Sequence, residues 1–299
     1  MMAKKSFIVR MSQLVSLLLV ARIFMLLLFT FTLYVSTFFL FSQEESLRNF
    51  VFDYKVHGII LCSLLSIASG GIINQFYDFE KDQLQKPFRT KLQSFLKQKY
   101  FLYSYIILNI ISLSIAVLLS PRIFVFFLLY QFMMWFYSHK LSKILMVNNL
   151  TFVSLTLYPF FGMLVYYQHF SWKLFWMAMF LFLILLIVDI LKDILTLRPD
   201  TIFGYRTLPN VLGIKATTIV LSILLIANAW ISFLVVQHIL EHHLLVVYFS
   251  LSIVILLLSL LPIFFFRFKR MYWLVNLLRI WIFLGVVFML LNGIFERVG

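Results

Sequence analysis

Two short clusters of acidic and amide residues are the parts of this chain whose residue types and spacing could do chemistry. Their members are Asn74, Asp78 and Asp82 in the first cluster and Asp189, Asp193 and Asp200 in the second. Residues four apart on a helix lie on one face, one turn above another. Each cluster therefore predicts a ridge of oxygen atoms at the end of a helix, and two such ridges can face each other.

Carboxylates at this spacing repel one another, and at the C-terminal end of a helix they also oppose the helix dipole. A cation must compensate them. Mg²⁺ takes oxygen ligands and is usually held by one or two carboxylates together with substrate phosphates. The two ridges therefore indicate a Mg²⁺-diphosphate site. The basic residues that would contact the diphosphate oxygens are Lys86 and Arg89 after the first ridge and Lys192 and Arg206 around the second. The alternative is that these acids only solvate helix ends.

The composition places these ridges in a membrane protein. Of 299 residues, 63% are hydrophobic and 12% are charged, whereas soluble domains hold about 45 to 50% apolar and about 25% charged residues. The surplus must face lipid, which excludes a soluble enzyme. The net charge of +14 does not indicate nucleic acid, because the basic residues lie in short loops between apolar runs. With Cys62 as the single cysteine, no disulfide or cysteine-based metal site is expected.

Runs of about 20 apolar residues predict membrane-spanning helices. We expect nine, within four residues at each end, near 14–42, 57–78, 100–119, 122–138, 150–167, 173–193, 216–237, 245–266 and 272–294. The predicted fold is an all-α bundle of about nine transmembrane helices in one integral-membrane domain over residues 1–299.

The loop charges predict the orientation. With a cytoplasmic N-terminus, most of the 25 Lys and Arg fall on the inner side, as the positive-inside rule requires. Every acidic residue on that side then belongs to, or adjoins, one of the two ridges. We expect a multi-pass protein of the cell (inner) membrane whose active site faces the cytoplasm.

The residues around the ridges resemble the two Asp-rich motifs of the UbiA-type intramembrane prenyltransferases. The first motif is the stretch from Asn74 to Asp82 followed by Lys86-Pro87, and the second is Lys192-Asp193-Ile194 with Asp200, Gly204, Arg206-Thr207-Leu208-Pro209 and Leu212-Gly213. Arg22 in the first span, and Tyr137-Ser138 with Lys143 after the fourth, occupy positions where that family has a basic residue and a Tyr-Ser/Thr plus Lys signature. The resemblance extends over the whole chain.

This resemblance implies nine helices around a central cavity with a Mg²⁺-diphosphate site at its cytoplasmic mouth. The family moves a prenyl group from a polyprenyl diphosphate to an acceptor. By this resemblance the carboxylates of Asp78, Asp82, Asp189 and Asp193 are the catalytic groups. Asn74, Asp78 and Asp82 would hold one metal ion, and Asp189 and Asp193 the other. The residues that would grip the diphosphate are Lys86, Arg89, Lys143, Lys192 and Arg206, with Arg22 assisting.

Some positions depart from the family pattern. Thr196 stands where relatives often continue the second ridge with an Asp, and Pro199 takes a Gly position before Asp200. The acceptor is either an aromatic quinone precursor or a glycerol-phosphate ether lipid, and the sequence does not separate the two. A membrane transporter and a degenerate homologue that binds isoprenoid diphosphate without turnover are the alternatives. A transporter would place its charges near the bilayer midplane; here they lie at one surface.

Overall fold

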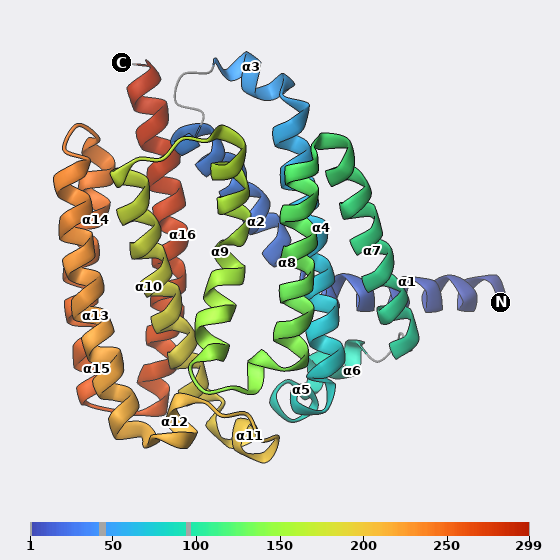
Figure 1. Cartoon of the computed structure of the whole chain (residues 1–299). Coiled ribbons are helices and arrows are strands. Elements are labelled where there is room, and N and C mark those ends of the chain that lie inside the picture. The colour runs from blue at the N-terminus through green and yellow to red at the C-terminus, as the bar shows by residue number, and fades with distance from the viewer. Residues whose placement is uncertain (1, 42–45, 94–96, 299) are drawn as a thin grey trace. The chain divides into compact units, whose positions relative to one another are not determined.

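The computed structural model describes residues 2–41, 46–93 and 97–298, and over these ranges the chain is helical and has no strand (Figure 1). The chain forms two compact units. Unit 1 holds Met1–Tyr34 and Glu45–Ser142, and unit 2 holds Val35–Glu44 and Lys143–Gly299. Each ridge lies within one unit. The single domain expected over the whole chain stays a prediction.

The helices of unit 1 are α1 (Met2–Val20), α2 (Ile23–Ser36, which runs on into unit 2), α3 (Leu47–Phe52), α4 (Tyr54–Tyr77), α5 (Phe79–Gln85), α6 (Pro87–Gln93), α7 (Gln98–Leu119) and α8 (Pro121–His139). A short 3-10 helix, Leu141–Lys143, leads out of this unit. The helices of unit 2 are a π-helix (Thr37–Phe41), α9 (Val147–Tyr167), α10 (Trp172–Leu195), α11 (Leu197–Ile202), α12 (Leu208–Val211), α13 (Gly213–His238), α14 (His243–Leu258), α15 (Leu260–Phe264) and α16 (Phe268–Val298).

The prediction of a helical membrane protein is confirmed. In the described part of the chain, eight helical segments are long and apolar enough to cross a membrane. Helix α8 is 19 residues long but less apolar, because it carries Arg122, Gln131, two Tyr residues and one Trp. With α8 included, every expected span after the first matches a helical segment within the four residues allowed at each end.

The first expected span, 14–42, is wrong as a single helix. Helix α1 ends at Val20, the chain turns at Ala21 and Arg22, and the apolar segment that can cross the membrane is Ile23–Phe41; residue 42 lies outside the described ranges. An unbroken helix over 14–42 would be about 43 Å long, against a hydrocarbon thickness of about 30 Å. Arg22 makes the break with a left-handed φ of 56°, and Figure 1 shows α1 running crosswise to α4 and α7 within unit 1.

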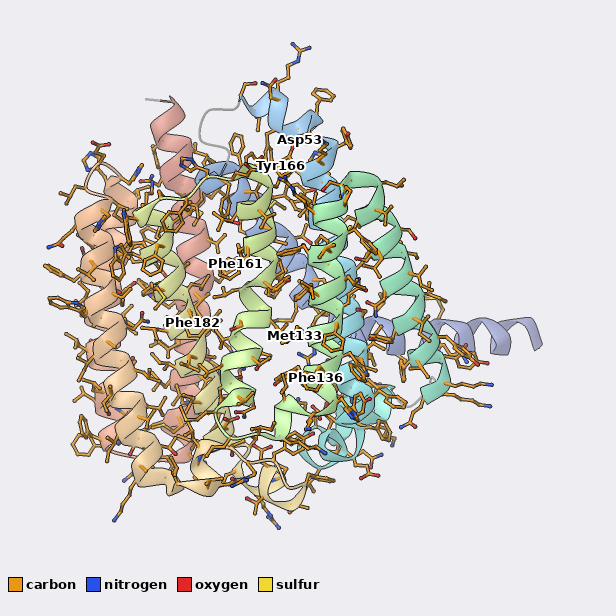
Figure 2. All side chains as sticks on the ribbon, in the orientation of Figure 1. Asp53, Met133, Phe136, Phe161, Tyr166 and Phe182 are labelled. Atoms are coloured by element: carbon orange, nitrogen blue, oxygen red, sulfur yellow. The ribbon has the colours of Figure 1, made fainter. Side chains whose placement is uncertain are left out.

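Helix α4 carries the first ridge and has an aspartate at each end. At its start, the Asp53 carboxylate accepts hydrogen bonds from the backbone N–H groups of Lys55 (3.0 Å) and Val56 (3.3 Å), and Figure 2 labels this end of the helix. That carboxylate complements the positive end of the helix dipole. Asp78 follows the last residue of α4 and is also the N-cap residue of α5, where its side chain accepts no capping hydrogen bond. The dipole of α4 disfavours a carboxylate at this position, and the dipole of α5 favours it.

Buried polar side chains fix α4 against α7 and α8. The Gln131 amide donates to Ser66 Oγ (3.2 Å), and the hydroxyls of Ser66 and Ser112 share a hydrogen bond of 3.1 Å. Ser69 also donates to Asn109 Oδ1 (2.6 Å). These contacts join three apolar helices by bonds that hydrocarbon cannot replace. They set the position of the helix that carries the first ridge.

In unit 2, α10 carries the second ridge and packs against α9, α13 and α16. Its first turn lies beside the α13–α14 connection, because Lys173 Nζ is 2.6 Å from His242 Nε2. Its last turns hold Asp189 and Asp193. Over 24 residues the helix is about 36 Å long, so His242 and the second ridge lie at opposite ends of it, as the topology requires.

The polar contact between α4 and α8 gives the first prediction. Ser66→Ala and Gln131→Leu should each lower the free energy of unfolding, and the double variant should lose less than the sum, with a coupling of about 0.6 to 1.7 kcal/mol. Unfolding in mixed detergent micelles measures all three. Gln98→Leu, at the exposed start of α7, is the control and should change the free energy by less than about 0.5 kcal/mol. Strictly additive losses would contradict the contact.

Candidate functional site

The first ridge keeps its four-residue step although the helix axis changes at Asp78. Backbone hydrogen bonds run from Asp78 N to Asn74 O (2.9 Å), from Asp82 N to Asp78 O (2.8 Å) and from Lys86 N to Asp82 O (2.8 Å). The Asn74 amide donates to Asp78 Oδ2 (3.0 Å), and Lys86 Nζ lies 3.3 Å from Asp82 Oδ1. The structure therefore brings Asn74, Asp78, Asp82 and Lys86 onto consecutive turns, as the spacing predicts.

Arg22 lies beside helix α4, near Gly71 and about one helical turn before Asn74. Gly71 faces the turn between α1 and α2 at close range: a β-carbon at Gly71 would lie 3.3 Å from the Val20 carbonyl oxygen and 4.0 Å from Arg22 Cδ. Asn74 follows Gly71 by three residues on the same helix. Glycine here lets the α1–α2 turn approach α4, and the role of Arg22 at the ridge stays a prediction.

Arg89 in α6 joins the same group. Its Nη2 donates to the Leu19 carbonyl oxygen (2.8 Å), while its Nε is buried and has no hydrogen-bond partner among the described residues. Burial, followed by the charge of Arg22, lowers the pKa of the Arg89 guanidinium, and Asp82 acts in the opposite direction. A guanidinium stays charged under physiological conditions. Two like charges and a buried N–H donor without an acceptor suit an anion.

The second ridge is organised by a residue that the sequence did not single out. Asn149, in the first turn of α9, donates from Nδ2 to Asp189 Oδ2 (3.0 Å) and to Asp193 Oδ2 (2.8 Å). Lys192 Nζ lies 3.4 Å from Asp189 Oδ1 and 5.0 Å from the centre of the Phe152 ring. The only trace of Asn149 in the sequence is an amide pair, Asn148-Asn149, at the entrance of an apolar span.

The remaining basic candidates lie on adjoining loops of unit 2. Arg206 N donates to the Lys143 carbonyl oxygen (3.4 Å), and Lys143 Nζ lies 5.4 Å from the centre of the Tyr205 ring. Both Lys143 and Arg206 are exposed. The structure thus brings Lys143 next to Arg206, but no contact recorded for the described residues joins them to Asp189 or Asp193. Their role at the ridge stays a prediction.

The two departures from the family pattern have a local explanation. The Thr196 hydroxyl lies 2.6 Å from Asp200 Oδ2, and Asp200 is 1% exposed. Thr196 therefore holds Asp200 against the end of α10. Pro199 stands in the first turn of α11, where a missing backbone N–H costs nothing. Both residues build the turn that follows the second ridge.

The donor sets fit a Mg²⁺ ion that a substrate helps to bind. Within the described ranges, no group of three or more His, Cys, Asp or Glu side chains could hold a metal by itself. Asp189 and Asp193 instead share one amide whose Oδ1 is buried without a hydrogen-bond partner in that part of the chain. Carboxylate and amide oxygens are the hard ligands that Mg²⁺ takes together with phosphates. That the two ridges face each other stays a prediction.

Comparison with known proteins identifies the chain's relatives. The UbiA prenyltransferase family matches residues 29–292. Digeranylgeranylglyceryl phosphate synthase of Thermococcus gammatolerans is 28% identical over 180 residues, which are 60% of this chain and 64% of that protein. The enzyme of that name from Pyrococcus horikoshii is 30% identical over 173 residues, 55% of this chain and 59% of the other. These alignments span less than two thirds of those two relatives' lengths.

Solved structures agree on the fold. A structure described under the name digeranylgeranylglyceryl phosphate synthase has a TM-score of 0.70 and 18% identity, with 94% of this chain and 99% of that chain covered. A UbiA homolog from Archaeoglobus fulgidus bound to GPP and Mg²⁺ has a TM-score of 0.68 and 15% identity, with 93% and 99% covered. With a family match over residues 29–292 and this fold, the chain belongs to the UbiA prenyltransferase family.

Proposed function

We propose that this protein transfers a prenyl group from a polyprenyl diphosphate to a glycerol-phosphate lipid within the membrane, with Mg²⁺ as cofactor. The observation that carries the proposal is the contrast between two charged groups. The charge of Arg22 opposes that of Arg89 and Asp82 acts in the other direction, while Asp189 and Asp193 share one neutral amide beside the Lys192 ammonium. Magnesium and a diphosphate would neutralise both groups. Membership of the family supports this reading.

The residues of unit 1 would bind the donor. Arg22, Arg89 and Lys86 present cationic N–H donors around the first ridge, and a buried N–H of Arg89 awaits an acceptor. Guanidinium groups match phosphate oxygens in geometry and charge. Asn74, Asp78 and Asp82 would hold one metal ion beside them, and Asp189 and Asp193 in unit 2 would hold the other. Lys192, with Lys143 and Arg206, would add contacts to the diphosphate.

The chemistry follows from these roles. Mg²⁺, when bound, neutralises charge on the diphosphate as it leaves. The allylic C–O bond breaks with its electron pair going to the diphosphate. An acceptor hydroxyl oxygen attacks the prenyl carbon and forms an ether, and its proton passes to the departing diphosphate. Cationic side chains such as Arg89 hold the leaving group in place. Water at the site would capture the prenyl cation, so the bound prenyl chain and acceptor must keep it out during transfer.

The choice of acceptor rests on the relatives. Both named relatives are digeranylgeranylglyceryl phosphate synthases. The name describes a glycerol phosphate that carries two geranylgeranyl groups. This favours the glycerol-phosphate ether class over an aromatic quinone precursor. The experiment that decides is mass spectrometry of lipids formed by membranes containing the protein, given geranylgeranyl diphosphate and either acceptor. A prenylated aromatic product alone would overturn the acceptor, and no product from either would favour a degenerate homologue.

Removing one carboxylate from either ridge should slow turnover strongly and leave the fold intact. Asp78→Asn and Asp193→Asn should each lower the rate of prenyl transfer by about a hundredfold or more, the scale on which even the outer partners of a metal matter. Because each substitution relieves repulsion, neither variant should melt below wild type without metal. Glu241→Gln, on the exposed connection between α13 and α14, should keep full activity. Full activity in both Asn variants, or in EDTA, would refute the metal site.

Arg22 and Arg89 give a prediction about the melting temperature without ligand and about its rise when ligand is added. Arg22→Gln removes one of two like charges, so the ligand-free protein should melt no lower than wild type. The rise in melting temperature on adding inorganic pyrophosphate with Mg²⁺ should shrink by at least half, since binding energy appears as stability. Arg48→Gln, on the exposed helix α3, is the matched control. An unchanged pyrophosphate response in Arg22→Gln would remove this residue from the site.

Orientation is also proposed: we place both ridges on the cytoplasmic side of the cell membrane. In a Cys62→Ala background, single cysteines at Gln83 and Thr201 should react with an impermeant thiol reagent only from the cytoplasmic side. A cysteine at His243 should react from outside. His243 follows His242, whose side chain contacts Lys173 in the first turn of α10, at the end opposite the second ridge. Labelling of Gln83 and Thr201 from opposite sides would exclude a shared site.

A further inference from the structure

Asn149 stands between two acids in a way that helix packing does not require. It is 1% exposed, and its Nδ2 lies 3.0 Å from Asp189 Oδ2 and 2.8 Å from Asp193 Oδ2. Its Oδ1 is buried and accepts no hydrogen bond from any described residue. Carboxylates only accept, so the NH₂ end must face them. One neutral amide therefore serves two acids at the expense of its own oxygen.

The amide also sets the distance between the acids. The two N–H bonds of an amide diverge by about 120°, which places the two accepting carboxylate oxygens about 5 Å apart. A single Mg²⁺ bound to both at about 2.1 Å would hold them about 3 Å apart in adjacent octahedral positions. An ion that takes both Oδ2 atoms and the present amide contacts exclude each other. The amide nitrogen must leave its place when such a cation enters between Asp189 and Asp193.

We propose that Asn149 is a spacer that exchanges with the cation and then becomes a ligand. Without metal, its NH₂ group holds Asp189 and Asp193 in place. When Mg²⁺ enters, the amide turns over so that Oδ1, the atom that now lacks a donor, faces the ion. This inference rests on the proposed binding of Mg²⁺ by Asp189 and Asp193.

The turn needs no extra room. Oxygen and nitrogen of an amide are nearly the same size, so the side chain fits its space in either orientation. It gives up two hydrogen bonds to carboxylates, and the bonds of those carboxylates to the ion replace them. The gain is a third hard oxygen on the ion. The amide only reduces the repulsion between the two carboxylates, whereas the double positive charge of the Mg²⁺ ion neutralises both.

The test measures binding of Mg²⁺ alone to the full-length protein in detergent, after removal of metal with EDTA. Asn149→Leu keeps the volume and removes both polar atoms, and it should weaken the Mg²⁺ dissociation constant at least tenfold. Asn149→Asp restores an oxygen, and it should bind Mg²⁺ at least as tightly as wild type. Without metal, the melting temperature of this variant should fall below that of wild type, because three neighbouring carboxylates then repel one another.

Two further variants separate the possible causes of failure. Asn148→Leu alters the neighbouring amide, which is also buried, and it should leave Mg²⁺ affinity within twofold of wild type. Asp193→Asn should lose Mg²⁺ binding; if it does not, the proposed metal site itself fails. With that site intact, affinity within twofold of wild type in Asn149→Leu would overturn the spacer role. Asn149→Asp binding Mg²⁺ tenfold more weakly than wild type would overturn the ligand role, whether or not Asn149→Leu folds.

Discussion

A carboxylate at the C-terminal end of a transmembrane helix meets three penalties together: the helix dipole, the nearby hydrocarbon and its neighbour one turn away. The protein places such acids on two helices and compensates them only in part. Asp78 receives the Asn74 amide and Asp82 the Lys86 ammonium, while Asp189 and Asp193 share Asn149 and Asp189 also meets the Lys192 ammonium. Neutral amides leave negative charge uncancelled. The helices around the ridges serve to keep that charge in place.

The two units solve this problem differently. In unit 1 the acids lie beside a pair of arginines, and the lowered pKa of Arg89 shows that burial and Arg22 weigh against its charge more than Asp82 favours it. In unit 2 the two acids share the Asn149 amide, and the Lys192 ammonium lies 3.4 Å from one of them, Asp189. The partly buried guanidinium of unit 1 suits an anion, and the paired acids of unit 2 suit a cation.

Much of this could be predicted from the sequence, because the signals are local. Apolar runs of helical length fix the spans, and a four-residue step fixes which side chains share a face. The prediction of the first span was wrong because hydropathy does not show where a long apolar run turns. The one sign of the turn in the sequence is the charged Arg22. Asn149 was missed for another reason. It meets Asp189 and Asp193 across two helices, 40 and 44 residues apart in the chain, and no local pattern encodes such a contact.

The turn at Arg22 also bears on how the chain enters the membrane. The last turns of α1 are held by α6: Ser16 donates to the Gln93 carbonyl oxygen (2.6 Å), and Arg89 donates to that of Leu19. Both partners emerge from the ribosome 70 or more residues later, which is several seconds at about 5 to 20 residues per second. The contacts that hold the end of α1 beside α6 can therefore form only after α6 has left the ribosome, although the apolar segment of α2 is complete well before that.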